Sequence, residues 1–183
     1  MTKPKTRAQE RRDSLRSQFW PDEKAWLTEK ETGWFAAPRY LPLMLSLLGS
    51  KRISRNQDPS YVYIELFSRH FGGGLIEMSD EREHAFAAGY EGPRAMRTWQ
   101  ERMRILEEYG FIRTKEAGNQ RYKYVLLLHP KAVIRRLHAS GLVDEAWWTT
   151  YRARLAELNE DDSEFADEGP LEIGRRKKKQ KAE

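Results

Sequence analysis

The chain has 183 residues, a formal net charge of +5, a hydrophobic fraction of 39% and no cysteine. This length suits one domain of ordinary size with tails, and the lack of cysteine excludes disulfides and thiolate metal sites. No apolar run reaches the roughly 20 residues that a membrane span needs, and the first residues lack the apolar centre of a secretory signal, so we expect a cytoplasmic protein with no membrane partner.

The N-terminal third is expected to support a core that follows it. Residues 1–18 are polar and basic and predict either a frayed helix or a flexible arm. Aromatic residues then recur from Phe19 to Phe35, and Asp22 can cap a helix that runs to about Glu31. We expect these rings to pack on the core. The apolar segment 38–50 is predicted to be buried, and 51–58 to be a polar connection.

The predicted core, residues 59–128, begins with a helix. Asp58-Pro59 is a favourable helix start, and 61–71 is expected to bury Ile64, Phe67 and Phe71, although its alternating pattern also fits a strand. Three glycines follow at 72–74. No Lys-Ser or Lys-Thr pair comes after them, so they predict a turn and not a phosphate-binding loop.

A short strand, LIEM at 75–78, precedes two predicted helices. Ser79 or Asp80 can cap the first, 81–88, whose inner face would carry His84, Ala85 and Ala88. A turn at Gly89 to Pro93 leads to the second helix, 93–108. Along this helix the apolar residues recur at helical spacing and should be buried: Met96, Trp99, Met103 and Leu106. The opposite side then carries Arg94, Arg97, Thr98, Glu101 and Arg104.

A basic hairpin is predicted at 112–124. Its turn is Ala117-Gly118-Asn119-Gln120. The arms carry four cations: Arg113, Lys115, Arg121 and Lys123.

Two further helices are predicted after the hairpin. The first begins at Pro130 and closes at Gly141; the second places Val143, Trp147, Tyr151, Arg154 and Leu158 on one face. That face would dock on the core or on a second copy of the chain, giving a homodimer through Trp147, Trp148 and Tyr151. Residues 159–183 are acidic and then basic and predict a disordered tail. We therefore expect a basic arm at 1–18, one domain at 19–158 and a tail at 159–183.

This order of elements resembles the winged helix-turn-helix proteins of bacterial regulators and of plasmid or mobile-element genes. The segments that carry the resemblance are YVYIELFSRHF, LIEM, EREHAFAAGY, PRAMRTWQERMRILEEY and GFIR. The resemblance implies a mainly α fold with a small β-hairpin wing, an α+β winged helix-turn-helix extended by N- and C-terminal helices. One departure is Glu91-Gly92-Pro93, because this family usually has a Ser or Thr cap before its recognition helix.

The predicted function is sequence-specific binding of double-stranded DNA, most simply by a nucleoid-associated transcriptional regulator. Helix 93–108 would enter the major groove, with Arg94 and Arg97 on guanine, Thr98 on a thymine methyl group or a phosphate, and Glu101 on cytosine N4. The hairpin 112–124 would contact the backbone or the minor groove. The expected DNA-binding residues are Arg94, Arg97, Thr98, Glu101, Arg104, Arg113, Lys115, Asn119, Gln120, Arg121 and Lys123.

Two alternatives accompany this interpretation. The arginines of helix 93–108 could form a solvated face with Glu–Arg pairs, as in a winged helix that binds protein. The chain would then be an adaptor or a DNA-binding subunit in plasmid or mobile-element replication or maintenance machinery.

Catalysis is not expected. The four histidines are scattered, and the sequence contains no HExxH, GxSxG or Walker-type motif. No metal site and no cofactor are therefore predicted.

Overall fold

The computed structural model describes residues 6–19, 21, 33, 35–70 and 73–171. The chain divides into two units, 1–36 and 37–183. In the first unit the basic arm forms a helix, α1 (Arg7–Phe19). Phe19 and Phe35 are exposed. The helix predicted from Asp22 to Glu31, with the three tryptophans of this stretch, lies outside the described residues.

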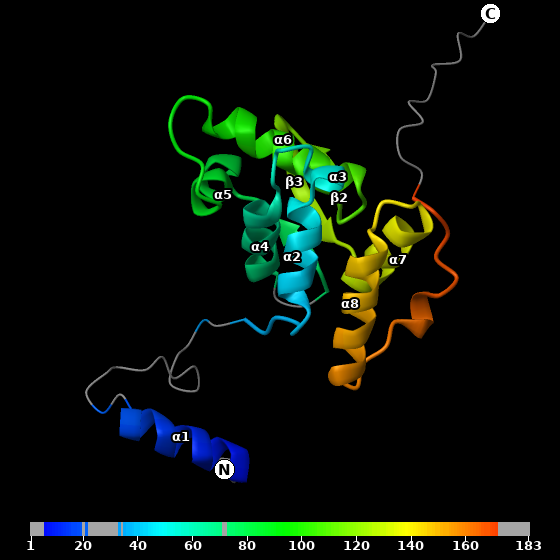
Figure 1. The fold of residues 1–183 in the computed structure, drawn as a ribbon. Helices are drawn as coiled ribbons and strands as arrows, with labels where there is room; N and C mark the ends of the chain where they lie inside the picture. Colours follow the sequence, from blue (N-terminus) through cyan, green and yellow to red (C-terminus); the bar gives the residue numbers. More distant parts are fainter. Residues whose placement is uncertain (1–5, 20, 22–32, 34, 71–72, 172–183) are drawn as a thin grey trace, which may run out of the picture. The chain divides into compact units, whose positions relative to one another are not determined.

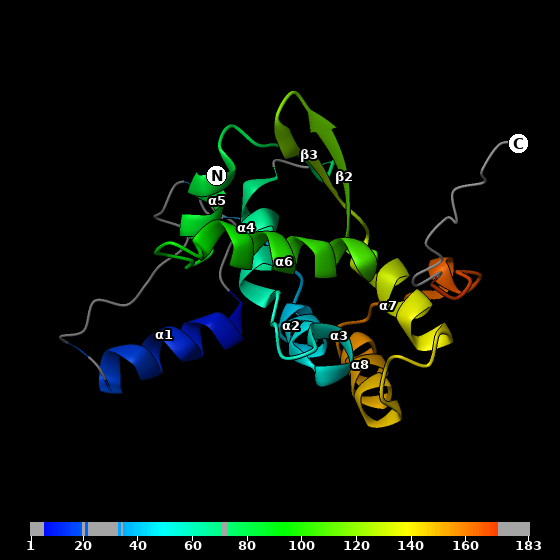
Figure 2. The ribbon, with the colours of Figure 1, turned by 90° about the horizontal axis from the view of Figure 1, so that it is seen from above.

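The second unit is an α+β structure, which confirms the general fold class (Figures 1 and 2). Its described residues contain seven α-helices and a three-stranded antiparallel sheet in the order β1-β3-β2. The elements are α2 (Leu41–Gly49), α3 (Lys51–Ser54), α4 (Ser60–Arg69), β1 (Leu75–Glu77), α5 (Glu81–Ala87), α6 (Ala95–Glu108), β2 (Ile112–Ala117), β3 (Gln120–Leu127), α7 (Pro130–Ala139) and α8 (Glu145–Glu157).

The segment after Pro59 is a helix and not a strand. The Asp58 carboxylate accepts a hydrogen bond from the Ser60 amide at 2.9 Å and so stabilises the start of α4. The predicted inner face is only part of the side of α4 that contacts the core. Val62, Tyr63 and Leu66 are buried, whereas Ile64 and Phe67 are partly buried and Phe71 lies outside the described residues.

The connection predicted at 51–58 contains one helical turn, α3. Ile53 is fully buried, and the Tyr109 hydroxyl donates a hydrogen bond to the Arg52 carbonyl at 3.1 Å. The buried Ile53 side chain and the hydrogen bond from Tyr109 together attach this turn to the core.

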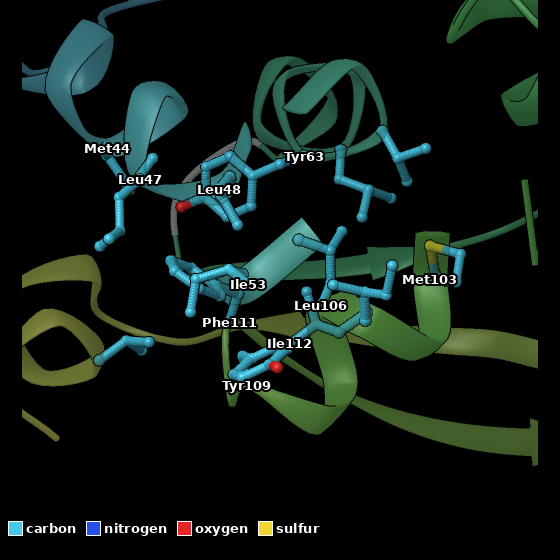
Figure 3. Close-up of a cluster of buried hydrophobic side chains, with 14 of the residues drawn as sticks. Met44, Leu47, Leu48, Ile53, Tyr63, Met103, Leu106, Tyr109, Phe111 and Ile112 are labelled. Carbon is cyan, nitrogen blue, oxygen red and sulfur yellow. The ribbon is translucent and has the colours of Figure 1, made fainter. Parts of the chain in front are cut away.

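The core lies between the helices and the inner face of the sheet. Tyr63 and Phe111 meet edge to face with ring centroids 5.8 Å apart, and Trp99 and Tyr122 do so at 5.4 Å. Figure 3 shows how residues from α2, α3, α4 and α6 and from the start of β2 converge there. Its labelled members are Met44, Leu47, Leu48, Ile53, Tyr63, Met103, Leu106, Tyr109, Phe111 and Ile112.

Helix α8 packs against α2 by a face that only partly matches the predicted one: Val143, Trp147 and Tyr151 face inward as expected, and Leu155 takes the place of Arg154. Tyr151 and Leu155 are its buried residues, whereas Arg154 pairs with Glu157 at 2.8 Å. The Trp147 indole N–H donates to the Leu43 carbonyl at 3.2 Å, and the Trp148 ring stacks on His138 with centroids 4.0 Å apart. Docking within one chain thus accounts for the three aromatic residues, and a homodimer through them stays a prediction.

The acidic part of the predicted tail packs against α7 and α8. Asp162 is fully buried, and one of its carboxylate oxygens lies 2.6 Å from Arg135 Nη2 and 2.9 Å from Arg152 Nη1. The Leu171 amide donates to Ser140 Oγ at 2.7 Å. Residues 159–171 are therefore an ordered strap, because these helices present arginines to its carboxylates; 172–183 lie outside the described residues.

Within the part of the chain that the structure describes, no helix combines the length and apolar character needed to cross a bilayer.

The strap should contribute measurably to stability. Replacing Asp162 with Ala leaves Arg135 partly buried without its carboxylate. We expect the free energy of unfolding to fall by about 2 to 4 kcal/mol, less than for a fully buried pair because Arg152 is half exposed. Urea unfolding followed by circular dichroism measures this change. Asp167→Ala, at an exposed position of the same segment, is the control and should change stability by less than about 0.5 kcal/mol. Equal effects of the two substitutions would contradict the assigned role of Asp162.

Candidate nucleic-acid interface

Helix α6 begins at Ala95, two residues later than predicted. Arg94 is its N-cap residue and makes no side-chain capping hydrogen bond. Gly92 has a φ of +80°, which favours glycine, so the chain turns sharply between α5 and α6. Pro93 therefore belongs to the turn.

The apolar side of α6 faces the core, as the periodicity predicts. Trp99, Met103 and Leu106 are fully buried. Met96 is only partly buried, and Ile105 is an additional buried residue that the predicted stripe omitted. The other side of the helix is consequently turned to solvent.

Three arginines lie on the outward side of α6. Arg94, Arg97 and Arg104 are exposed, and the Arg97 side chain retains 84% of its accessible surface. Arg97 Nε lies 3.2 Å from a carboxylate oxygen of Glu101, whose other oxygen lies 3.4 Å from Arg102. Among the described residues Arg94 and Arg104 make no ion pair. Thr98 is half-buried beside them.

Helix α5 is fixed to α4 by a buried polar contact. The predicted inner residues His84, Ala85 and Ala88 are all buried. His84 Nδ1 lies 3.1 Å from Glu65 Oε1, and the same carboxylate accepts from Arg69 Nε at 2.7 Å. At the other end, the Asp80 carboxylate accepts from the Arg82 amide and caps the helix.

The hairpin residues predicted to bind DNA do not all lie beside α6. Arg121 Nη2 lies 3.9 Å from Glu107 of α6, so this cation is next to the helix. Arg113 and Lys115 are opposite Leu126 and Tyr124 in the sheet and share their face. That face is turned away from α6, because the intervening Thr114 bonds to Glu107 and its partner Val125 is buried.

Two further hairpin residues are engaged within the fold. Lys123 Nζ donates to the Met78 carbonyl at 3.0 Å and pairs with Glu77 at 3.0 Å. Gln120 Nε2 donates to the Ser79 carbonyl at 2.9 Å. Asn119 remains exposed at the turn, next to Gly118 with a φ of +61°. The predicted set therefore separates into residues beside α6, residues on the far face of the sheet, and residues that hold the hairpin in place.

Sequence reasoning missed three residues at this site. Glu81 accepts hydrogen bonds from the Tyr122 amide at 3.0 Å and from Gln100 Nε2 at 3.5 Å. It therefore joins α5, α6 and β3. Glu107 contacts both hairpin strands, and Arg82 is exposed at the start of α5. The Asp80 cap could have indicated the position of Arg82, whereas no local signal identifies the long-range contacts of the two glutamates.

One titratable group at the site, the Tyr122 hydroxyl, has a shifted pKa. Burial raises the pKa of the Tyr122 hydroxyl, although the nearby cations Arg121 and Arg104 oppose this shift. The phenol consequently stays neutral at physiological pH, where it donates a hydrogen bond to the Gln100 carbonyl at 3.5 Å. No cluster of histidine and acidic residues suited to a metal ion occurs among the residues placed by the structure.

Comparisons of the chain with protein-family models, with curated proteins and with solved structures give no match.

The two sides of α6 should respond differently to substitution. Trp99→Ala removes a fully buried ring and should lower the free energy of unfolding by about 3 to 5 kcal/mol. Arg97→Ala removes an exposed side chain with one surface ion pair and should change stability by less than about 0.5 kcal/mol. Urea unfolding monitored by circular dichroism compares the two variants. Similar losses for both would contradict the observed orientation of the helix.

Proposed function

We propose that residues 60–128 form a winged helix-turn-helix and that the protein binds double-stranded DNA sequence-specifically, most simply as a transcriptional regulator. In this proposal α5 and α6 are the helix-turn-helix, α6 is the recognition helix and the β2–β3 hairpin is the wing. The observation that carries the proposal is the division of α6 into an apolar side that packs on the core and an outward side with three exposed arginines.

The dimensions of α6 suit a major groove. Its 14 residues span about 21 Å, and the major groove is wide enough to admit an α-helix. Arg94 and Arg97 stand at the N-terminal end, which is where recognition helices usually reach base edges. Their guanidinium groups can bind guanine O6 and N7 in a bidentate manner. Arg104, about two turns further along the helix, is suited to a phosphate.

Fewer residues of the wing can contact a duplex than the sequence predicts. Arg121 lies beside α6, and Asn119 is exposed at the tip, so these two residues can approach a duplex together with the helix. Such contacts supply affinity and register more than sequence preference. Arg113 and Lys115 lie on the opposite face of the sheet and are not part of the proposed interface.

The position of Glu101 on α6 favours sequence-specific over nonspecific DNA binding. It lies between Arg97 and Arg102, and its carboxylate can accept from cytosine N4. A carboxylate in the middle of the helix repels phosphate groups and so weakens nonspecific binding. This surface therefore favours a DNA sequence whose bases offer a hydrogen-bond donor to Glu101 and acceptors to the arginines.

The direct test is selection of bound sequences from random duplexes, followed by the double substitution Arg94→Ala with Arg97→Ala. The parent should select a defined motif. In the double variant, the ratio of affinities for the selected and scrambled duplexes should fall by at least about fivefold for each bidentate contact that is removed. Fluorescence anisotropy with the selected duplex and a scrambled duplex measures this preference. Arg39→Ala with Arg154→Ala removes the same charge elsewhere and should keep the parental preference. A double variant of α6 that binds the selected duplex as tightly as the parent would refute the assignment.

The basic run at 175–181, outside the described residues, should contribute in a different way. Its deletion should weaken binding to selected and scrambled duplexes by the same factor. The slope of log affinity against log salt concentration is negative, and the deletion should make it less steep by about 0.9 for each phosphate that the run neutralises in the parent complex. Anisotropy titrations at several salt concentrations give both quantities. A loss of affinity confined to the selected duplex would show that this run reads sequence.

A protein adaptor is the second candidate, because one feature of the sheet favours protein binding. The face that carries Arg113 and Lys115 also exposes a group of apolar side chains. A protein can bind DNA with α6 and another protein with this face.

A further inference from the structure

The sheet has one buried face and one exposed face. Ile76 pairs with Val125, which pairs with Thr114, and this row points toward α6 and the core. The residues on either side of these three along each strand point away from the core. Leu75 is opposite Leu126 and Leu126 is opposite Arg113, while Tyr124 lies between Glu77 and Lys115. Because partners in an antiparallel sheet share a face, these six residues form the outer face of the sheet.

The centre of this outer face is apolar and exposed. Leu75 retains 59% of its accessible surface, and Tyr124 and Leu126 retain 38% each. These side chains line a depression of about 510 Å³ together with Arg113, Thr114 and Lys115. A contiguous apolar depression with a polar rim is a feature of binding surfaces.

The charges at the rim of the depression are positive. Lys115 makes no ion pair within the described ranges, and Arg113 Nη1 donates to the Ile112 carbonyl at 3.2 Å. Glu77 is the acidic residue of this face, and Lys123 neutralises it at 3.0 Å. A partner that covers the depression therefore meets two exposed cations, Arg113 and Lys115, of which Lys115 has no carboxylate partner among the described residues.

The size of the face favours a short segment over a folded partner. The three residues of β1 span about 10 Å, and three strands spaced about 4.8 Å apart add a similar width. The exposed parts of Leu75, Tyr124 and Leu126 together amount to on the order of 300 Å², which is well below the roughly 800 Å² that each partner buries in a standard interface. A second folded copy of this chain is therefore a poor occupant. Duplex DNA is also a poor occupant, because the two leucines provide neither hydrogen bonds nor charge to a phosphate backbone.

We propose that the outer face of the sheet docks a short linear segment of a partner protein, which places one large apolar side chain over Leu75, Tyr124 and Leu126 and sets Asp or Glu residues against Arg113 and Lys115. This docking site is separate from the α6 face and does not depend on DNA binding.

The test is selection of a phage-displayed random peptide library on the immobilised full chain, with excess random duplex present throughout. The selected peptides should share a large apolar residue with acidic residues within a few positions. A fluorescein-labelled consensus peptide should bind the parent and lose at least tenfold in affinity with Leu126→Asp. Leu75→Asp, at the more exposed position, should give the same loss. If circular dichroism shows that Leu126→Asp does not fold, the Leu75→Asp variant decides the result.

Charge reversal provides the sharper control. Arg113→Glu with Lys115→Glu should reject the consensus peptide and bind a version of it with Lys in place of the acidic residues. Arg94→Glu with Arg104→Glu, the same change of charge on α6, should keep the affinity for the original peptide within twofold.

Three outcomes would overturn the proposal. The first is a library that yields no peptide, or only peptides without the acidic and apolar pattern. The second is a consensus peptide that binds the Leu126→Asp variant as well as the parent. The third is a Leu126→Asp variant that loses duplex binding or dissociates a dimer in sedimentation, because the face would then belong to DNA or to a second copy.

Discussion

The burial of one side of α6 against the inner face of the sheet is the constraint on which the rest of the structure depends. Trp99 meets Tyr122 of β3 edge to face at 5.4 Å, and Met103 and Leu106 are fully enclosed. Such close packing fixes the rotation of the helix about its axis, because a turn of even one residue would bring arginines into the core. The outward position of Arg94, Arg97 and Arg104 is therefore a consequence of core packing.

The surrounding polar contacts keep this arrangement in register. Glu81 joins α5 to α6 and β3, and the buried Glu65–His84 contact joins α4 to α5. Because each of these carboxylates serves more than one element, a helix cannot shift without leaving a polar group unpaired. The same sheet that holds α6 on its inner face exposes Leu75, Tyr124 and Leu126 on its outer face. Two separate surfaces are thus built around one small sheet.

The sequence predicted those elements whose local pattern is unambiguous. The spacing of Trp99, Met103 and Leu106 indicated the buried side of α6, and the turn at Gly118 located the hairpin. For α4 it identified the helix but not its most buried residues, because apolar residues occur on several sides and only tertiary packing buries Tyr63 more deeply than Ile64. It also failed for the strap, because the pairing of Asp162 with Arg135 and Arg152 joins distant residues and local composition alone suggests disorder. The irregular register near Lys115 concealed which hairpin cations lie beside α6.

Chemical-shift mapping of the backbone amides with a selected duplex tests the central claim most directly. The largest changes in ¹H–¹⁵N spectra should fall on the exposed positions of α6 and on Asn119 and Arg121. The amides of Leu75 and Leu126 on the outer face should change little. Changes concentrated on that outer face, or no changes on α6 with a duplex that binds, would contradict the account.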